Sequence, residues 1–120
     1  MLAIIHARMS SKRLPGKVLM PLGKRKILEI IHDRVSSAST IKQIIVATST
    51  ESSDDPIYEF CNSMNYNCHR GPLENLQLRM FEALNSVHKD CFVRICGDSP
   101  LIDPYIVDLA VNLFTQGNFD

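Results

Sequence analysis

The sequence has 120 residues, 45% of them hydrophobic and 22% charged, and its formal net charge is zero. This composition is typical of one small globular domain with a hydrophobic core, and it excludes binding to nucleic acid or to a membrane surface through overall positive charge. No apolar run approaches the roughly 20 residues that cross a bilayer, and the first residues lack the pattern of a signal peptide. We therefore expect a cytoplasmic protein without a membrane or nucleic-acid partner.

The chain begins with a predicted strand that leads into a strongly basic loop. Residues 2–7, LAIIHA, form a short apolar run that favours a buried strand. The loop at residues 8–23 contains two prolines and two glycines, too many for a helix. Seven of the 13 lysines and arginines precede Glu29, the first acidic residue. A stretch whose charges all have the same sign makes an anion a candidate ligand of this loop.

Downstream of the loop, segments with helical spacing alternate with apolar runs. Helices are predicted from Ile27 onward, at 57–64, at 73–88 and from Asp103 and Pro104 onward, and strands at 41–49, 66–71 and 91–97. This alternation is typical of a Rossmann-like three-layer α/β/α fold, in which helices cover both faces of a mainly parallel sheet. Ligands of such sheets bind beyond the carboxyl ends of the strands, where the loops after the first and fourth strands fall.

The remaining acidic pair and the cysteines have simple structural interpretations. Asp54 and Asp55 stand before a predicted helix and are interpreted as a charge pair at its N-terminus. The four cysteines form no C-x-x-C pair, which favours buried free thiols in a reducing cytoplasm. A zinc site at Cys61, Cys68 and His69 is disfavoured, because the spacings do not match those of zinc ligands.

The residue types of the basic loop suit a polyphosphate. Four cations can surround the anion, two small serines let backbone N–H groups approach it, and a glycine permits a tight turn. These residues are Arg8, Lys12, Arg13, Lys17, Ser10, Ser11 and Gly16. The loop matches neither the Walker P-loop nor the G-x-G-x-x-G dinucleotide pattern. On spacing alone, a solvated basic loop without a ligand is an equal alternative.

A second loop strengthens the interpretation of the first. In GDSPLID, Asp98 follows a predicted strand directly after Gly97. A carboxylate that faces a polyphosphate loop across the end of a sheet is what a magnesium site requires. Asp98 alone could equally cap the turn, so the two loops together carry the prediction.

Five segments in order then carry a resemblance to a known family. They are ARMSSKRLPGKVLMPL at 7–22, ILEIIHDRV at 27–35, IIVATS at 44–49, HRGPLENLQLRMFEAL at 69–84 and VRICGDSPLIDP at 93–104. Together they resemble the spore-coat polysaccharide biosynthesis branch of the cytidylyltransferases, which are relatives of the acylneuraminate and 3-deoxy-manno-octulosonate cytidylyltransferases. The pairing of R-L-P-G-K after a first strand with G-D-x-P-L-I-D after a later one is specific, and the resemblance runs from Ala3 to about Asp108.

The resemblance implies a nucleotide-diphospho-sugar transferase-like fold and a nucleotidyl transfer with magnesium. CMP would pass from CTP to a sugar or sugar-phosphate acceptor by in-line attack on the α-phosphorus, releasing pyrophosphate. Arg13 and Lys17 would stabilise the charge on the departing pyrophosphate.

The same resemblance assigns residues to parts of the nucleotide. The triphosphate loop would comprise Arg8, Ser10, Ser11, Arg13 and Lys17, with Asp98 as the metal-binding aspartate. Ala7, Thr48, Ser49 and the segment from Arg70 to Asn75, with Glu74, would lie around the base and ribose.

Some features depart from the family pattern. Ser10 replaces a usual glycine, His6 replaces a frequent glutamine, and Glu74 with Asn75 replaces an acidic pair. The family's chain also continues well past residue 120, so we expect residues 1–120 to be the nucleotide-binding portion of a truncated domain. Its strand order would be 3-2-1-4, with the fourth strand left as an open edge that favours self-association.

One other function stays open, and another is disfavoured. A truncated chain could be a non-catalytic nucleotide-binding or assembly domain. A sugar transferase of related fold would need an Asp-x-Asp motif, which the sequence lacks.

Overall fold

A four-stranded parallel sheet forms the centre of the computed structural model, which describes residues 1–117. Its strands are β1 (Leu2–His6), β4 (Gln43–Ser49), β5 (Cys68–Gly71) and β6 (Phe92–Cys96). They lie in the order β5-β4-β1-β6, and every pairing is parallel. When only the strands of this sheet are numbered along the chain, this is the predicted order 3-2-1-4.

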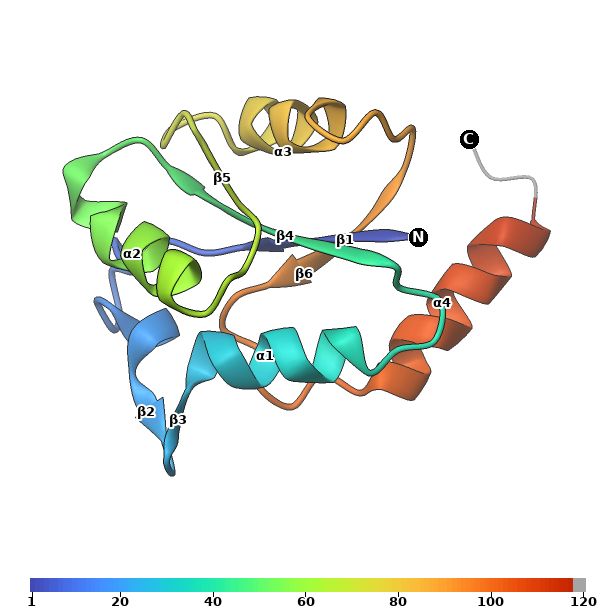
Figure 1. Cartoon of the computed structure of the whole chain (residues 1–120), viewed down its shortest axis with the longest axis horizontal. Coiled ribbons are helices and arrows are strands. Elements are labelled where there is room, and N and C mark those ends of the chain that lie inside the picture. The colour runs from blue at the N-terminus through green and yellow to red at the C-terminus, as the bar shows by residue number, and fades with distance from the viewer. Residues whose placement is uncertain (118–120) are drawn as a thin grey trace.

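Helices cover both faces of the sheet, as predicted (Figure 1). The helix α3 (Leu76–Asn85) lies on one face, and α1 (Ile27–Ser36), α2 (Asp55–Ser63) and α4 (Pro104–Gln116) lie on the other. Helices α2 and α4 each carry a proline in the first turn, where the backbone N–H that proline lacks has no partner within the helix. Asp103 caps α4 by accepting the N–H of Tyr105 at 2.8 Å.

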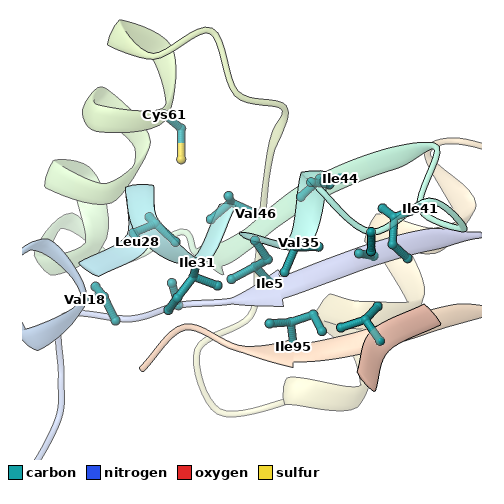
Figure 2. Close-up of a cluster of buried hydrophobic side chains, with 14 of the residues drawn as sticks. Ile5, Val18, Leu28, Ile31, Val35, Ile41, Ile44, Val46, Cys61 and Ile95 are labelled. Atoms are coloured by element: carbon teal, nitrogen blue, oxygen red, sulfur yellow. The ribbon is translucent and has the colours of Figure 1, made fainter. Parts of the chain in front are cut away.

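The core is divided by the sheet into two clusters, because alternate side chains of a strand point to opposite faces. Ala3 and Ile5 join the larger cluster with α1, α2 and α4, part of which is shown in Figure 2. Leu2 and Ile4 join the smaller cluster under α3. All four side chains are buried, which is why the strand reads as a continuous apolar run.

A small antiparallel hairpin was not predicted. It pairs β2 (Pro21–Leu22) with β3 (Arg25–Lys26) and turns at Gly23, whose φ of 66° lies in the left-handed region. Two 3-10 turns, η1 (Lys17–Leu19) and η2 (Ser52–Asp54), also interrupt the predicted loops.

The prediction of buried thiols is correct for Cys61 alone. Cys91 is exposed, and Cys68 and Cys96 are half-buried. Cys91 lies before β6 begins, and Cys96 lies on a strand that has one neighbour among the described residues, so neither is enclosed by the sheet.

The sheet ends at β6, and the helix that follows this strand exposes apolar side chains. Within residues 1–117, β6 pairs with β1 alone, which confirms the predicted open edge. Several large apolar side chains of α4 are exposed, namely Tyr105, Ile106, Leu109, Leu113 and Phe114. In this described part, no helix is both long and apolar enough to cross a membrane.

Candidate functional site

A pocket of about 370 Å³ opens beyond the carboxyl ends of β1 and β6. Its lining combines four cations with one carboxylate and the small residues at the strand ends. The charged members are Arg8, Lys12, Arg13, Lys17 and Asp98. The two loops that the sequence indicated therefore meet in one cavity.

The basic loop is held by its own backbone. Ala7 extends the pairing of β1 by donating its N–H to Ala47 at 3.0 Å. The carbonyl of Met9 then accepts the N–H groups of Ser11 at 2.9 Å and of Gly16 at 2.8 Å. Gly16 has φ of 72°, a left-handed conformation that glycine adopts without strain. These bonds close the loop on itself and leave its cations at the rim of the pocket.

Asp98 reaches the pocket because Gly97 packs closely against β1. The N–H of Gly97 donates to the carbonyl of His6 at 2.9 Å. A Cβ at position 97 would lie 2.7 Å from that same oxygen, which is too close for any side chain. The following residue, Asp98, forms an ion pair with Lys17 of the basic loop. The hydrogen bond from Lys17 holds the pKa of the Asp98 carboxyl below its usual value.

His6 adds a neutral polar group to the floor of the pocket. Burial lowers the pKa of its imidazole, and the positive charges of Arg94 and Arg79 lower it further. The guanidinium of Arg94 lies 3.3 Å from Nε2 of His6. His6 is thus uncharged near neutral pH and can offer a hydrogen-bonding nitrogen to a ligand.

The structure brings seven of the residues predicted for the site into the pocket lining. These are Ala7, Arg8, Ser11, Lys12, Arg13, Lys17 and Asp98. The sequence did not single out His6 and Val18 as lining residues, because neither belongs to a charged or glycine-rich pattern.

The other predicted site residues lie outside this pocket. Ser10 is exposed on the loop, and Thr48 and Ser49 are fully buried at the end of β4. The hydroxyl of Ser49 donates to Asp54. The side chain of Asn75 caps α3 by accepting the N–H of Leu78 at 2.9 Å.

Glu74 precedes the Asn75 cap and is exposed. The side-chain oxygens of Ser49 and Asn75 therefore form hydrogen bonds within the protein and not with a nucleotide in this pocket. The spacing of residues in the sequence does not reveal these bonds.

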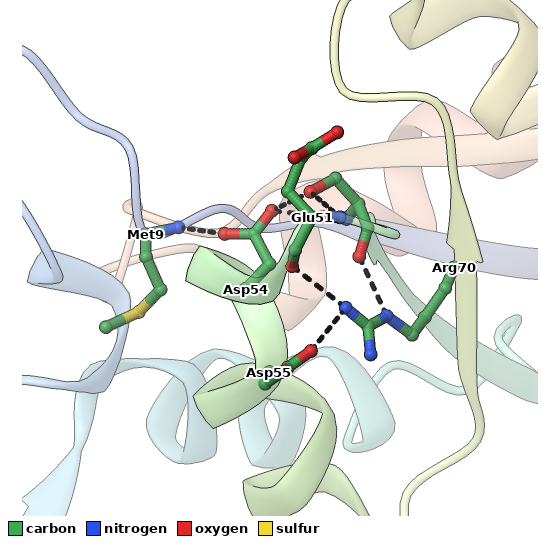
Figure 3. Close-up of polar contacts among 6 residues, drawn as sticks. Met9, Glu51, Asp54, Asp55 and Arg70 are labelled. Atoms are coloured by element: carbon green, nitrogen blue, oxygen red, sulfur yellow. Dashed lines mark hydrogen bonds and ion pairs between the residues drawn. The ribbon is translucent and has the colours of Figure 1, made fainter.

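Asp54 differs from the predicted helix charge pair. Its side chain is fully buried and makes no capping bond to α2. Instead it accepts hydrogen bonds from Met9 and from Ser49 (Figure 3). Asp55 pairs with Arg70 of β5 at 2.7 Å.

Arg70 holds the turn between β4 and α2. Besides contacting Asp55, it donates to the carbonyls of Ser49 at 2.8 Å and Glu51 at 3.0 Å (Figure 3). The predicted base-side residue thus supports the wall beside the basic loop and does not line the pocket.

Comparisons with known proteins agree on one family. A family model described as cytidylyltransferase matches residues 2–120. The chain is 34% identical to the spore coat polysaccharide biosynthesis protein SpsF of Bacillus subtilis over 122 residues, covering 98% of this chain and 51% of that protein. A cytidylyltransferase structure from Leptospira borgpetersenii superposes with a TM-score of 0.90 and 35% identity, covering 97% of this chain and 49% of the other.

A third comparison supports the fold at greater distance. The structure of CMP:2-keto-3-deoxy-manno-octonic acid synthetase complexed with CTP has a TM-score of 0.83 at 19% identity, and the match covers 96% of this chain and 47% of that one. The chain thus spans about half the length of the proteins it matches.

Proposed function

Because the chain belongs to the cytidylyltransferase family, we propose that its basic pocket binds CTP and that the complete domain transfers CMP to a sugar or sugar-phosphate acceptor. Pyrophosphate would be released, and the product would serve the synthesis of a polysaccharide or another cell-surface glycan. The observation that carries this proposal is the meeting of four cations and Asp98 at the carboxyl edge of a parallel sheet.

In this proposal the cations act by position and charge. Attack by an acceptor oxygen on the α-phosphorus forms one P–O bond and breaks another, and the bonding electrons leave with pyrophosphate. Arg13 can contact two phosphate oxygens at once through its planar guanidinium, and Lys17 offers a point charge. Both lie on the pocket wall, where they would stabilise the charge that develops on the leaving group. No covalent nucleophile is needed.

Asp98 fits a magnesium ion that is shared with the nucleotide. Among residues 1–117, no three acidic, histidine or cysteine side chains cluster as a ready-made metal site. Magnesium, however, is commonly held by one or two carboxylates together with substrate phosphates. The Asp98 side chain is 42% exposed and faces the cations, so its carboxylate can serve as that single protein ligand. Bound there, magnesium would offset the negative charge of the phosphates.

Magnesium and Lys17 would compete for the same carboxylate. Lys17 forms an ion pair with Asp98 in the structure. A cation at Asp98 would release the Lys17 ammonium toward the phosphates. We therefore expect magnesium to bind well with nucleotide and poorly without it.

A second candidate is a nucleotide-binding or assembly domain without catalysis of its own. The observation that favours it is the exposed apolar surface of α4 next to the open edge of β6, which suits contact with further protein. This candidate shares the CTP pocket and differs in lacking turnover.

Calorimetric titration with CTP, UTP, ATP and GTP in magnesium tests the proposed function. CTP should bind most tightly. Arg13→Ala should weaken CTP binding about tenfold or more, because a charged hydrogen bond contributes about 1.5–3 kcal/mol. Lys24→Ala is the matched control: Lys24 is an exposed cation at the tip of the β2–β3 hairpin, outside the pocket lining. Equal losses from both variants would mean a diffuse basic surface and would contradict the proposal.

A further inference from the structure

The buried carboxylate of Asp54 joins two parts of the chain that are far apart in sequence. Its Oδ1 atom accepts the backbone N–H of Met9 at 2.7 Å, across 45 sequence positions. Its Oδ2 atom accepts the N–H of Ser49 at 3.2 Å and also the hydroxyl of Ser49. The side chain has no exposed surface, so these bonds replace the water that an ionised carboxylate would otherwise require.

Met9 is the point from which the basic loop is built. The amide of Met9 is fixed by Asp54, and its carbonyl accepts both Ser11 and Gly16. A shift of the Met9 peptide would therefore move both ends of the closed loop, including the start of η1 at Lys17. The Asp54–Met9 bond thus links the loop that carries the cations to the turn after β4.

The turn that contains Asp54 is tied to the sheet. Asp54 lies in η2, and the turn that contains it is held by three hydrogen bonds from Arg70 of β5 (Figure 3). The sheet thus supports the turn through Arg70, and the turn supports the loop through Asp54. Asp54 itself does not line the pocket.

We propose that Asp54 is a positioning residue for the phosphate-binding loop: it sets the geometry of the triphosphate site through the Met9 amide without contacting the nucleotide. The inference rests on the proposed function, because it assigns the loop to the phosphates. Sequence reasoning missed this role, since an acidic residue before a helix reads as a helix N-terminal charge.

The test separates this role from simple support of the turn. Asp54→Asn keeps the size of the side chain but removes the charge and puts an NH2 group against one of the two donors. Ser49→Ala is the matched control, because it deletes a hydroxyl bond to Asp54 and leaves the Met9 bond in place. Both variants should lose thermal stability.

Two measurements on folded protein should then diverge. Asp54→Asn should accelerate hydrogen exchange across residues 9–17, because the charged hydrogen bond that fixes Met9 is weakened. It should also weaken CTP binding by up to about tenfold, because the loop cations are then less well positioned for the phosphates. Ser49→Ala should change neither by more than about twofold. If Asp54→Asn does not fold at the assay temperature, Asp54→Glu, which retains the charge on a longer side chain, is measured in the same way and should show the same divergence.

A double-mutant cycle with Arg13→Ala provides the decisive comparison. If Asp54 acts through the loop, Asp54→Asn should lose the part of its effect on CTP affinity that Arg13 carries when Arg13 is already absent. Undiminished, additive losses would overturn the proposal, as would an unchanged loop exchange rate in Asp54→Asn. If instead Arg13→Ala leaves CTP binding intact, the proposed function fails, and the exchange measurement still reports whether Asp54 orders the loop.

Discussion

Replacing Asp98 by asparagine isolates the role of the one acidic side chain that lines the pocket in the described part of the chain. In the free protein this carboxylate pairs with Lys17, and the two side chains are 42% and 24% exposed. A partly exposed ion pair contributes only about 0.2–1 kcal/mol, so the fold should tolerate its loss. The same charge repels the phosphates of CTP and restrains the Lys17 ammonium. Its removal should therefore strengthen magnesium-free CTP binding by up to about fivefold, since 1.36 kcal/mol corresponds to a factor of ten.

Calorimetric titration with CTP, first with a chelator and then with excess magnesium, measures both effects. In the wild type, magnesium should increase the affinity for CTP clearly, whereas in Asp98→Asn the increase should shrink to less than about twofold. Asp33→Asn is the matched control, because Asp33 forms a similar ion pair with Arg25 and is 51% exposed, but lies outside the pocket lining. An equal magnesium effect in wild type and Asp98→Asn would refute the assignment of Asp98 as the metal ligand.

Three further outcomes are expected. Gly97→Ala should lower the free energy of unfolding by about 1–3 kcal/mol in urea titration, because the new Cβ would lie 2.7 Å from the His6 carbonyl, and an unchanged value would show that the strand end adapts. Hydrogen bonds from Thr40 lower the pKa of Asp108 in the fold, so its stabilisation is complete above the unfolded pKa of about 3.9 and is lost as the pH falls below it. The difference in thermal midpoint between wild type and Asp108→Asn should hence shrink from pH 5 toward pH 2, and a constant difference would argue against this linkage. The wild-type chain should self-associate in sedimentation velocity through the apolar surface of α4, and Leu113→Glu, at a side chain 57% exposed, should reduce this; a monomeric wild type at high concentration would contradict it.

Periodicity made most of the fold predictable. Residues such as Ile4 and Ile45 sit in strands buried on both faces, and this burial leaves a continuous apolar run in the sequence. The β2–β3 hairpin could not be predicted, because each of its strands has only two residues, too few to show an alternating pattern. The strand order came from the resemblance, since no local pattern states which strands are neighbours.

The site was predictable where charge or glycine marks it and unpredictable where a polar side chain serves the fold. Arg13 and Asp98 stand out as charges beside breakers in loops at strand ends. Ser49 and Asn75 were assigned to the nucleotide, yet they bond to Asp54 and to the first turn of α3. A hydroxyl or amide near a strand end can bind a ligand or form a hydrogen bond within the fold. The sequence does not distinguish these two roles, because they depend on which group lies beside the side chain in the folded structure.

Because β1 lies between β4 and β6, the order of synthesis limits when the sheet can form. Leu2, at its start, pairs with Phe92 of β6, so β1 gains this partner only after β6 has been synthesised. At common rates of synthesis the ribosome needs roughly 5–20 seconds to cover that distance. During this interval one edge of an apolar strand has no partner, and the pocket lacks Asp98 altogether. Binding of the anion should therefore become possible only after Asp98 has been synthesised.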